Sequence, residues 1–118
     1  DIDGLKSLND TYGHQAGDCR ITEYAHHWRQ TAPRHAVLAR LGGDEFAACI
    51  AGEGHEVVEE FLASIRLNTP GVSIGTATQT SHTASIAELY ARADAELYQS
   101  RGRPLRDDSG SAARTQSN

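Results

Sequence analysis

A pair of adjacent glycines between two short apolar runs constrains the fold of this chain more than any other feature of its sequence. Gly42 and Gly43 separate residues 36–41 from residues 46–50, and each run has the length and composition of a β-strand. A glycine pair favours a tight turn, because both residues can adopt positive φ without strain. We therefore expect a β-hairpin that turns at Gly42 and Gly43.

Two carboxylates, Asp44 and Glu45, follow this turn directly. A turn without side chains lets phosphate groups approach the backbone, and carboxylates beside it can hold Mg²⁺ or Mn²⁺ against those phosphates. Asp1 and Asp3 are further carboxylates near a predicted strand end, and Lys6 is a cation suited to phosphate. Asp and Gly are also common turn residues, so these positions taken alone favour an ordinary turn over a metal and phosphate site.

Composition excludes several classes of protein. The chain has 118 residues, of which 38% are hydrophobic and 23% are charged, and this is enough for one globular domain with a modest core. Eleven basic residues against sixteen acidic ones give a net charge of −5, which argues against nucleic-acid binding and against contact with a membrane surface. We expect a phosphate ligand to need a metal ion as a partner.

Cellular location and chain boundaries also follow from composition. No apolar run approaches the roughly 18 residues that span a bilayer, and no secretory leader is visible. The two cysteines lack C-x-x-C spacing, which favours a reduced, cytoplasmic protein over a zinc or redox site. The sequence contains no methionine, so we expect it to be a piece of a longer chain.

Hydrophobic periodicity predicts helices along much of the chain. Apolar residues recur at helical spacing around Trp28, with Asp18 in the position of an N-cap and Pro33 beyond the far end. Ser85 and Glu88 have the spacing of a capping box. We expect helices at 4–11, from Asp18 to before Pro33, at 55–68 and at 85–100, and a further strand at 71–77. We expect a domain at 1–105 and a disordered tail at 106–118, because the tail lacks apolar residues.

Six short blocks occur along the chain in a recognisable order. They are Asp1-Ile2-Asp3-Gly4-Leu5-Lys6-Ser7-Leu8-Asn9-Asp10, Gly13-His14, Gly17-Asp18, Arg40-Leu41-Gly42-Gly43-Asp44-Glu45-Phe46, Ser73-Ile74-Gly75 and Ala93-Asp94-Ala95-Glu96-Leu97-Tyr98. Together they resemble the GGDEF domain of diguanylate cyclases over about residues 1–103. The resemblance implies an α/β (α+β) fold: a nucleotide-cyclase-like palm whose central, mostly antiparallel sheet is flanked by helices and carries the active-site hairpin.

The resemblance also implies a reaction and its partners. In this family two domains face each other as a homodimer, and each holds one GTP. The two nucleotides are joined into cyclic di-GMP with release of two pyrophosphates, and Mg²⁺ or Mn²⁺ is the cofactor. An upstream sensory or regulatory domain is expected in the full-length protein.

Site residues carry over from the family pattern one by one. Asp1, Asp44 and the backbone carbonyl of Ile2 resemble the metal ligands. Asp44, Glu45 and Lys6 resemble the catalytic group: Asp44 as proton acceptor, Glu45 in a supporting electrostatic role and Lys6 as the cation that neutralises charge in the transition state. The positions that resemble substrate contacts are Asn9, His14, Asp18, Gly42, Gly43 and Arg101.

Structural interpretations remain open for three of these substrate contacts. Asn9 and His14 could terminate the first helix, and Asp18 could be only an N-cap. The remaining histidines stand singly or side by side on a helix, and we expect them at the surface without a metal. Tyr24 and Trp28 are expected in the core.

The chain also departs from the family pattern. A strand and a helix that usually precede Asp1 are absent from the sequence, and the segment at 47–72 is short. Arg101 replaces a lysine, while Arg103 and Arg106 have no assigned role. The product-inhibition block Arg-x-x-Asp has no counterpart at 33–36, so we expect no feedback inhibition there. A non-catalytic GTP-binding module and an inactive truncated copy are the alternatives to a catalytic domain.

Overall fold

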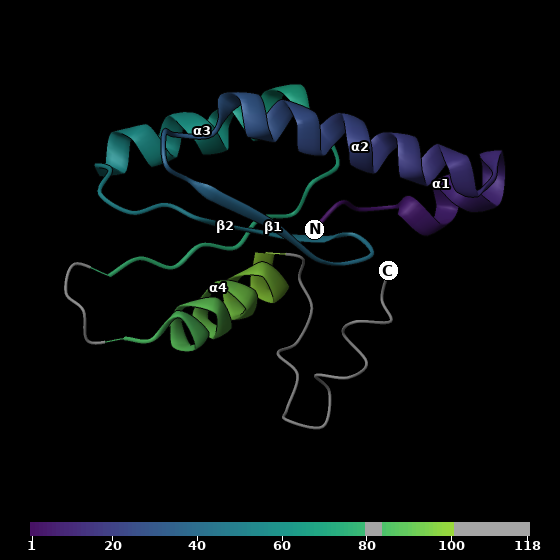
Figure 1. The fold of residues 1–118 in the computed structure, drawn as a ribbon. Helices are drawn as coiled ribbons and strands as arrows, with labels where there is room; N and C mark the ends of the chain where they lie inside the picture. Colours follow the sequence, from purple (N-terminus) through teal and green to yellow (C-terminus); the bar gives the residue numbers. More distant parts are fainter. Residues whose placement is uncertain (80–83, 101–118) are drawn as a thin grey trace. The chain divides into compact units, whose positions relative to one another are not determined.

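The structure is a computed structural model that describes residues 1–79 and 84–100. Its elements run in the order α1 (Leu5–Tyr12), α2 (His14–Thr31), β1 (Val37–Gly42), β2 (Glu45–Cys49), α3 (His55–Asn68) and α4 (Ile86–Ser100) (Figure 1). Helices combined with an antiparallel pair of strands make an α+β fold, consistent with a cyclase-like palm. No helix within the described ranges is long and apolar enough to cross a bilayer.

The chain divides into two compact units, and the boundary lies after Val72. The first unit holds α1, α2, the hairpin and α3, and the second begins at Ser73 and contains α4. The predicted helices at 4–11, 55–68 and 85–100 are confirmed to within one residue at each end. The predicted tail at 106–118 lies outside the described residues.

The predicted hairpin is confirmed, but its turn differs from the expected one. β1 and β2 pair antiparallel with Arg40 opposite Phe46 and Gly42 opposite Glu45, and the register shifts between Arg40 and Gly42. Gly43 and Asp44 are therefore the two turn residues, and neither is among the described residues with positive φ. The turn predicted at Gly42 and Gly43 therefore lies one residue later, and a turn with an L-residue in its second position favours negative φ.

The start of α2 also differs from the prediction. The helix begins at His14 with Gly13 as its N-cap residue, so Asp18 lies inside the helix and does not cap it. The N-cap interpretation of Asp18 is wrong. Asn9 supplies an acceptor to the start of α2 instead, because its Oδ1 atom accepts a hydrogen bond from the backbone N–H of Gly17 at 2.7 Å.

The core of the first unit forms between α2, α3 and the hairpin. Figure 1 shows α2 and α3 running side by side along the same side of the two strands. The predicted core aromatics Tyr24 and Trp28 are both only 6% exposed. Trp28 packs edge-on against Phe46 of β2, with ring centroids 5.1 Å apart, and α3 contributes the buried side chains of Phe61, Leu62 and Ile65.

The strand predicted at 71–77 does not form in the structure. Only Val72 takes part in β-pairing, as an isolated antiparallel bridge with Ile2. In the second unit the following residues lie along α4: Thr76 N donates to Glu96 Oε1 at 3.1 Å, and Arg92 donates to the carbonyl of Thr78 at 2.9 Å. Helix side chains thus satisfy backbone groups that a neighbouring strand would otherwise pair.

The capping box at the start of α4 is confirmed in one of its two bonds. The backbone N–H of Glu88 donates to Ser85 Oγ at 3.1 Å, as a capping serine requires. A second local contact fixes the approach to α4. A Cβ atom built on Gly75 would meet the carbonyl oxygen of Ala93 and would lie only 2.6 Å from the backbone nitrogen of Leu97. Gly75 therefore allows the extended segment to touch the helix backbone directly.

Candidate functional site

The four residues that follow α3, at 69–72, are held against α2 by hydrogen bonds from two aromatic side chains. The indole Nε1–H of Trp28 donates to Thr69 Oγ1 at 2.9 Å, and the hydroxyl of Tyr24 donates to the carbonyl of Pro70 at 2.7 Å. Thr69 is only 2% exposed, and its own hydroxyl donates to the carbonyl of Ile65 at 2.6 Å. These bonds fix the 69–72 segment against one face of α2.

The same segment holds the first residues of the chain. The backbone N–H of Asp3 donates to the carbonyl of Gly71 at 2.7 Å, and Ile2 forms its β-bridge with Val72. Ile2 is 1% exposed, so its side chain is anchored in the interior. The predicted metal-binding end of the chain is thus supported from one side by residues 71 and 72.

The hairpin supports the other side of Ile2 and carries the acidic pair. The backbone N–H of Ile2 donates to the carbonyl of Asp44 at 2.9 Å. This single bond places the backbone of residues 1 and 2 beside the turn that carries Asp44. The structure therefore brings together Asp1, Ile2 and Asp44, the three residues that the sequence assigns to metal binding.

Asp44 of the turn and Glu45, the first residue of β2, are both buried. Asp44 is 5% exposed and Glu45 is 9% exposed, and less than 1 Å² of the Oδ1 atom is accessible in both Asp44 and Asp1. Carboxylates are rarely this buried unless they are paired, hydrogen-bonded or bound to a metal. Arg40 holds the turn itself, because its Nε and Nη2 atoms donate to the carbonyl of Gly43 at 3.1 and 2.8 Å.

The three predicted metal ligands are all oxygen donors, the type that Mg²⁺ and Mn²⁺ prefer. They are the carboxylates of Asp1 and Asp44 and the backbone carbonyl of Ile2. Mg²⁺ is usually held by one or two carboxylates together with substrate phosphates and water, so a complete protein cage is not required. Within residues 1–79 and 84–100, no group of three or more His, Cys, Asp or Glu side chains is arranged to hold a metal, and the metal ligands stay a prediction.

The predicted base contacts lie at the junction of α1 and α2. Asn9 is on α1 and half-buried, and its bond to Gly17 connects the two helices. His14 is the first residue of α2, and Asp18 lies one turn further along; both are exposed. The interpretation of Asn9 as a helix terminator is incomplete, since its side chain binds the next helix. Lys6 is exposed on the first turn of α1.

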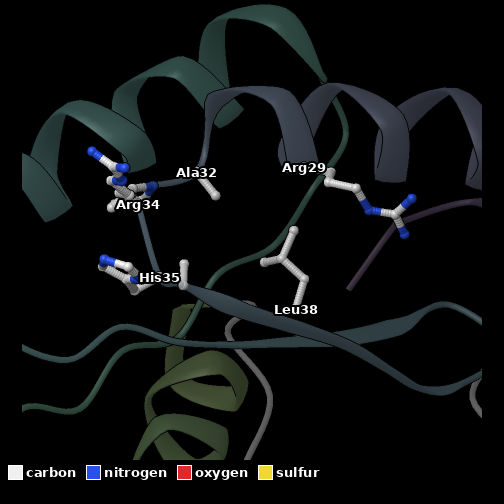
Figure 2. A pocket seen from close by; sticks show the side chains of 7 residues that line it. Arg29, Ala32, Arg34, His35 and Leu38 are labelled. Atoms are coloured by element: carbon white, nitrogen blue, oxygen red, sulfur yellow. The ribbon is translucent and has the colours of Figure 1, made fainter.

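A separate open pocket of about 440 Å³ lies beside the loop between α2 and β1. Residues 33–36, where the sequence lacks the product-inhibition motif, line this pocket, and His35 among them has a positive φ of 71°. Figure 2 shows the guanidinium groups of Arg29 and Arg34 on opposite sides of this pocket, with Leu38 between them. The two cations do not converge on one point, and the expected lack of product inhibition stays a prediction.

Sequence reasoning missed the residues that support the site. Thr69 and Arg40 make long-range or turn-closing bonds that no local pattern signals. A partial signal existed at Pro70 and Gly71, which predicted a turn but not its bonds to Tyr24 and Asp3. Arg101 lies outside the described residues.

Comparison with known proteins gives a consistent result. A family model described as diguanylate cyclase, GGDEF domain, matches residues 1–104. An uncharacterized 19.3 kDa protein of Streptomyces ambofaciens is 35% identical over 117 residues, which cover 90% of this chain and 63% of the relative. The probable diguanylate cyclase DgcC of Escherichia coli is 36% identical over 86% of this chain and 30% of its own length.

A third relative extends the same pattern. Diguanylate cyclase DgcS of Shewanella oneidensis is 32% identical over 86% of this chain and 37% of its own length. The chain thus spans less than two thirds of the length of each of these three relatives. Since the family model covers all of the residues that form α1 to α4, the chain belongs to the GGDEF domain family of diguanylate cyclases.

Proposed function

We propose that this chain is the catalytic domain of a diguanylate cyclase, a nucleotidyltransferase that acts as a homodimer on two molecules of GTP. The 3′-hydroxyl oxygen of each GTP attacks the α-phosphorus of the other. Two new phosphodiester bonds form, the two bonds between α- and β-phosphates break, and two pyrophosphates leave. The product is cyclic di-GMP.

One observation carries this proposal: the 2.9 Å bond between Ile2 N and the carbonyl of Asp44. It joins two sequence blocks that lie more than forty residues apart and puts the carboxylate-bearing residues Asp1 and Asp44 on adjacent backbones. Phosphoryl transfer depends mainly on positioning and charge neutralisation, and oxygen donors beside the two glycines at 42 and 43 would supply both.

Asp44, Glu45 and Lys6 have separate roles in the proposed reaction. Asp44 accepts the proton that leaves the 3′-hydroxyl, and Glu45 adds negative potential beside the ion. Asp1, Asp44 and the Ile2 carbonyl would hold Mg²⁺ or Mn²⁺, which would supply charge neutralisation at the phosphates and a more acidic attacking hydroxyl. Lys6 balances the negative charge that develops on the phosphates.

Substrate binding uses the α1–α2 junction and the turn. Asn9, His14 and Asp18 contact the guanine nucleotide, because amide and carboxylate groups match the donors and acceptors of the base. Gly42 and Gly43 leave room for the phosphates, and Arg101 binds them as a further cation. An upstream regulatory domain controls dimerisation in the complete protein, in keeping with the greater length of the relatives.

The direct test is product formation. The purified chain is incubated at high concentration with GTP and Mg²⁺, and cyclic di-GMP is measured by chromatography. Replacing Asp44 by Ala removes a metal ligand and the proton acceptor, so we expect the rate to fall by about a thousandfold, which corresponds to about 4 kcal/mol of transition-state stabilisation.

A matched control separates the loss of Asp44 as a reactive group from the loss of one negative charge. Asp10→Ala removes an exposed carboxylate from α1, and we expect it to leave the rate unchanged. A cooperatively folded chain that gives no cyclic di-GMP, or an Asp44→Ala variant as active as the Asp10→Ala variant, contradicts the proposal.

A non-catalytic GTP-binding module is the second candidate. The observation that favours it is the small size of the sheet, since β1 and β2 form a sheet of only two strands within residues 1–79 and 84–100. Calorimetry distinguishes the two functions: binding of GTP without any turnover supports the module and excludes the cyclase.

A further inference from the structure

We infer that Gly17 is a positioning residue for base selection: its backbone N–H fixes the amide of Asn9 so that the site accepts guanine and rejects adenine. The inference rests on the proposed GTP-binding function and deepens it, because it names the residue that sets the preference for the base. Gly17 itself contributes no side chain and acts only through Asn9.

The first observation is the direction of the hydrogen bond between these residues. Gly17 N is a donor, and it lies 2.7 Å from Asn9 Oδ1. An N–H group can bond only to the oxygen end of an amide, so this contact determines which end of the Asn9 side chain is which. The Nδ2 end keeps its two N–H donors, and no residue in the described parts of the chain accepts a hydrogen bond from it.

The second observation is the lack of space at Gly17. A Cβ atom at this position would collide with Asn9 Oδ1 and would lie 2.8 Å from Nδ2 and 2.9 Å from Cγ. Gly17 is buried inside α2, and it is not among the described residues with positive φ. Backbone conformation therefore does not require glycine here, and helix propensity disfavours it. The close approach of Asn9 is the physical reason for a glycine.

The third observation is the position of Asp18. This residue follows Gly17 directly, is exposed, and carries a carboxylate that only accepts hydrogen bonds at neutral pH. Asn9 and Asp18 thus present a donor and an acceptor from neighbouring positions. Guanine offers the complementary pair, with an acceptor at O6 and donors at N1 and N2. Adenine has a donor at N6 and an acceptor at N1, so both contacts would be mismatched.

Displacing the Asn9 side chain should therefore change base selection more than it changes overall binding. In Gly17→Ala the added methyl group pushes the end of the Asn9 side chain aside, because that end can rotate more easily than the helix can move. We expect GTP affinity, measured by calorimetry with Mg²⁺, to fall at least tenfold while ATP affinity stays the same. The ratio of the two affinities is a readout that a purely structural role would not move.

Two further variants isolate the mechanism. Asn9→Asp keeps an oxygen acceptor for Gly17 but replaces the Nδ2 donor by a second oxygen, so we expect unchanged thermal stability and at least a tenfold loss of GTP affinity. Gly54→Ala is the matched control, because a Cβ atom there has no neighbour within 4 Å and φ is an ordinary −75°. We expect this control to leave the ratio of GTP to ATP affinity unchanged.

Non-additivity gives an independent check. If Gly17 acts through Asn9, the double variant Asn9→Ala with Gly17→Ala loses no more GTP affinity than Asn9→Ala alone. Should Gly17→Ala or Asn9→Asp keep the wild-type ratio of affinities, the inference is overturned and the proposed function stands. A wild-type chain that does not bind GTP overturns the proposed function and the inference with it, so the two failures are distinguishable.

Discussion

At the scale of single residues, two glycines allow close approaches with different consequences. At Gly17 the neighbour is the end of the Asn9 side chain, which can rotate away from an added methyl group. At Gly75 the neighbours include the backbone carbonyl of Ala93 and the backbone nitrogen of Leu97, which belong to α4 and cannot rotate. A substitution at Gly17 should therefore alter recognition, whereas one at Gly75 should alter stability.

Gly75→Ala is expected to destabilise the second unit. The added Cβ atom would lie 2.6 Å from Leu97 N and 2.9 Å from Leu97 Cβ, so the extended segment must move away from α4. Overpacking of this kind costs about 1–3 kcal/mol of unfolding free energy. Hydrogen exchange of the α4 amides measures the effect, with Gly54→Ala as the control; equal protection in both variants would contradict the prediction.

At the scale of elements, the segment at 69–72 connects α2 to residues 2 and 3, and through them to the hairpin. It accepts hydrogen bonds from Trp28 and Tyr24 of α2, and it pairs with the backbone of residues 2 and 3. Residue 2 in turn bonds to the hairpin. These bonds hold residues 1–3 beside the hairpin. The position of Asp1 relative to Asp44 therefore depends on α2 as well as on the hairpin.

Thr69→Val tests this connection with a side chain of similar shape. Valine cannot accept the bond from Trp28 Nε1 or donate to the carbonyl of Ile65, so a buried donor is left without its partner. We expect a loss of about 1–3 kcal/mol in unfolding free energy, measured by urea denaturation. Thr69→Ser keeps the hydroxyl and should recover most of the loss. If serine destabilises the chain as much as valine does, the hydroxyl is not the cause.

Local patterns predicted the elements well but not their connections. The helices around Trp28 and Phe61 follow from apolar spacing, and the hairpin follows from the glycine pair. The start of α2 was misplaced because Asp18 resembles a cap, whereas the true acceptor comes from Asn9 on another helix. The strand at 71–77 failed because a strand requires a neighbour to pair with, and α4 satisfies part of that segment instead.

The candidate site was partly predictable for the same reason. Residue type alone favoured an ordinary turn, and Asp1 and Asp44 could be selected only because the order of the six sequence blocks resembles the GGDEF domain. Their adjacency depends on bonds between residues far apart along the chain, such as the one from Ile2 to Asp44. A short stretch of sequence around either residue does not show that the two residues lie side by side.

At the scale of the whole molecule, every described residue of the proposed site belongs to the first unit. The proposed reaction joins two nucleotides, one held by each of two domains. Under this proposal a single chain would provide half of the reaction centre, and product formation would require two competent copies facing each other. Activity should then depend on the assembly of copies as well as on the residues of one copy.

Mixing experiments test this dependence. Wild-type chain is combined with an excess of the Asp44→Ala variant, and cyclic di-GMP formation is measured per wild-type chain. If a two-fold symmetric pair is the active species, a tenfold excess of the variant should lower the rate by roughly tenfold at full dimerisation. Specific activity should also rise with total wild-type concentration. A rate that is independent of both would show that one chain suffices.

The single tryptophan stands at the connection between α2 and the segment that supports the site. Trp28 is buried, packs against Phe46 of the hairpin and donates to Thr69. Its fluorescence is therefore an intrinsic optical probe of the path that holds Asp1 beside Asp44. A variant that loses nucleotide binding with an unchanged emission spectrum has a local defect in recognition, whereas a red-shifted spectrum reports that water has reached the indole and that this path has opened.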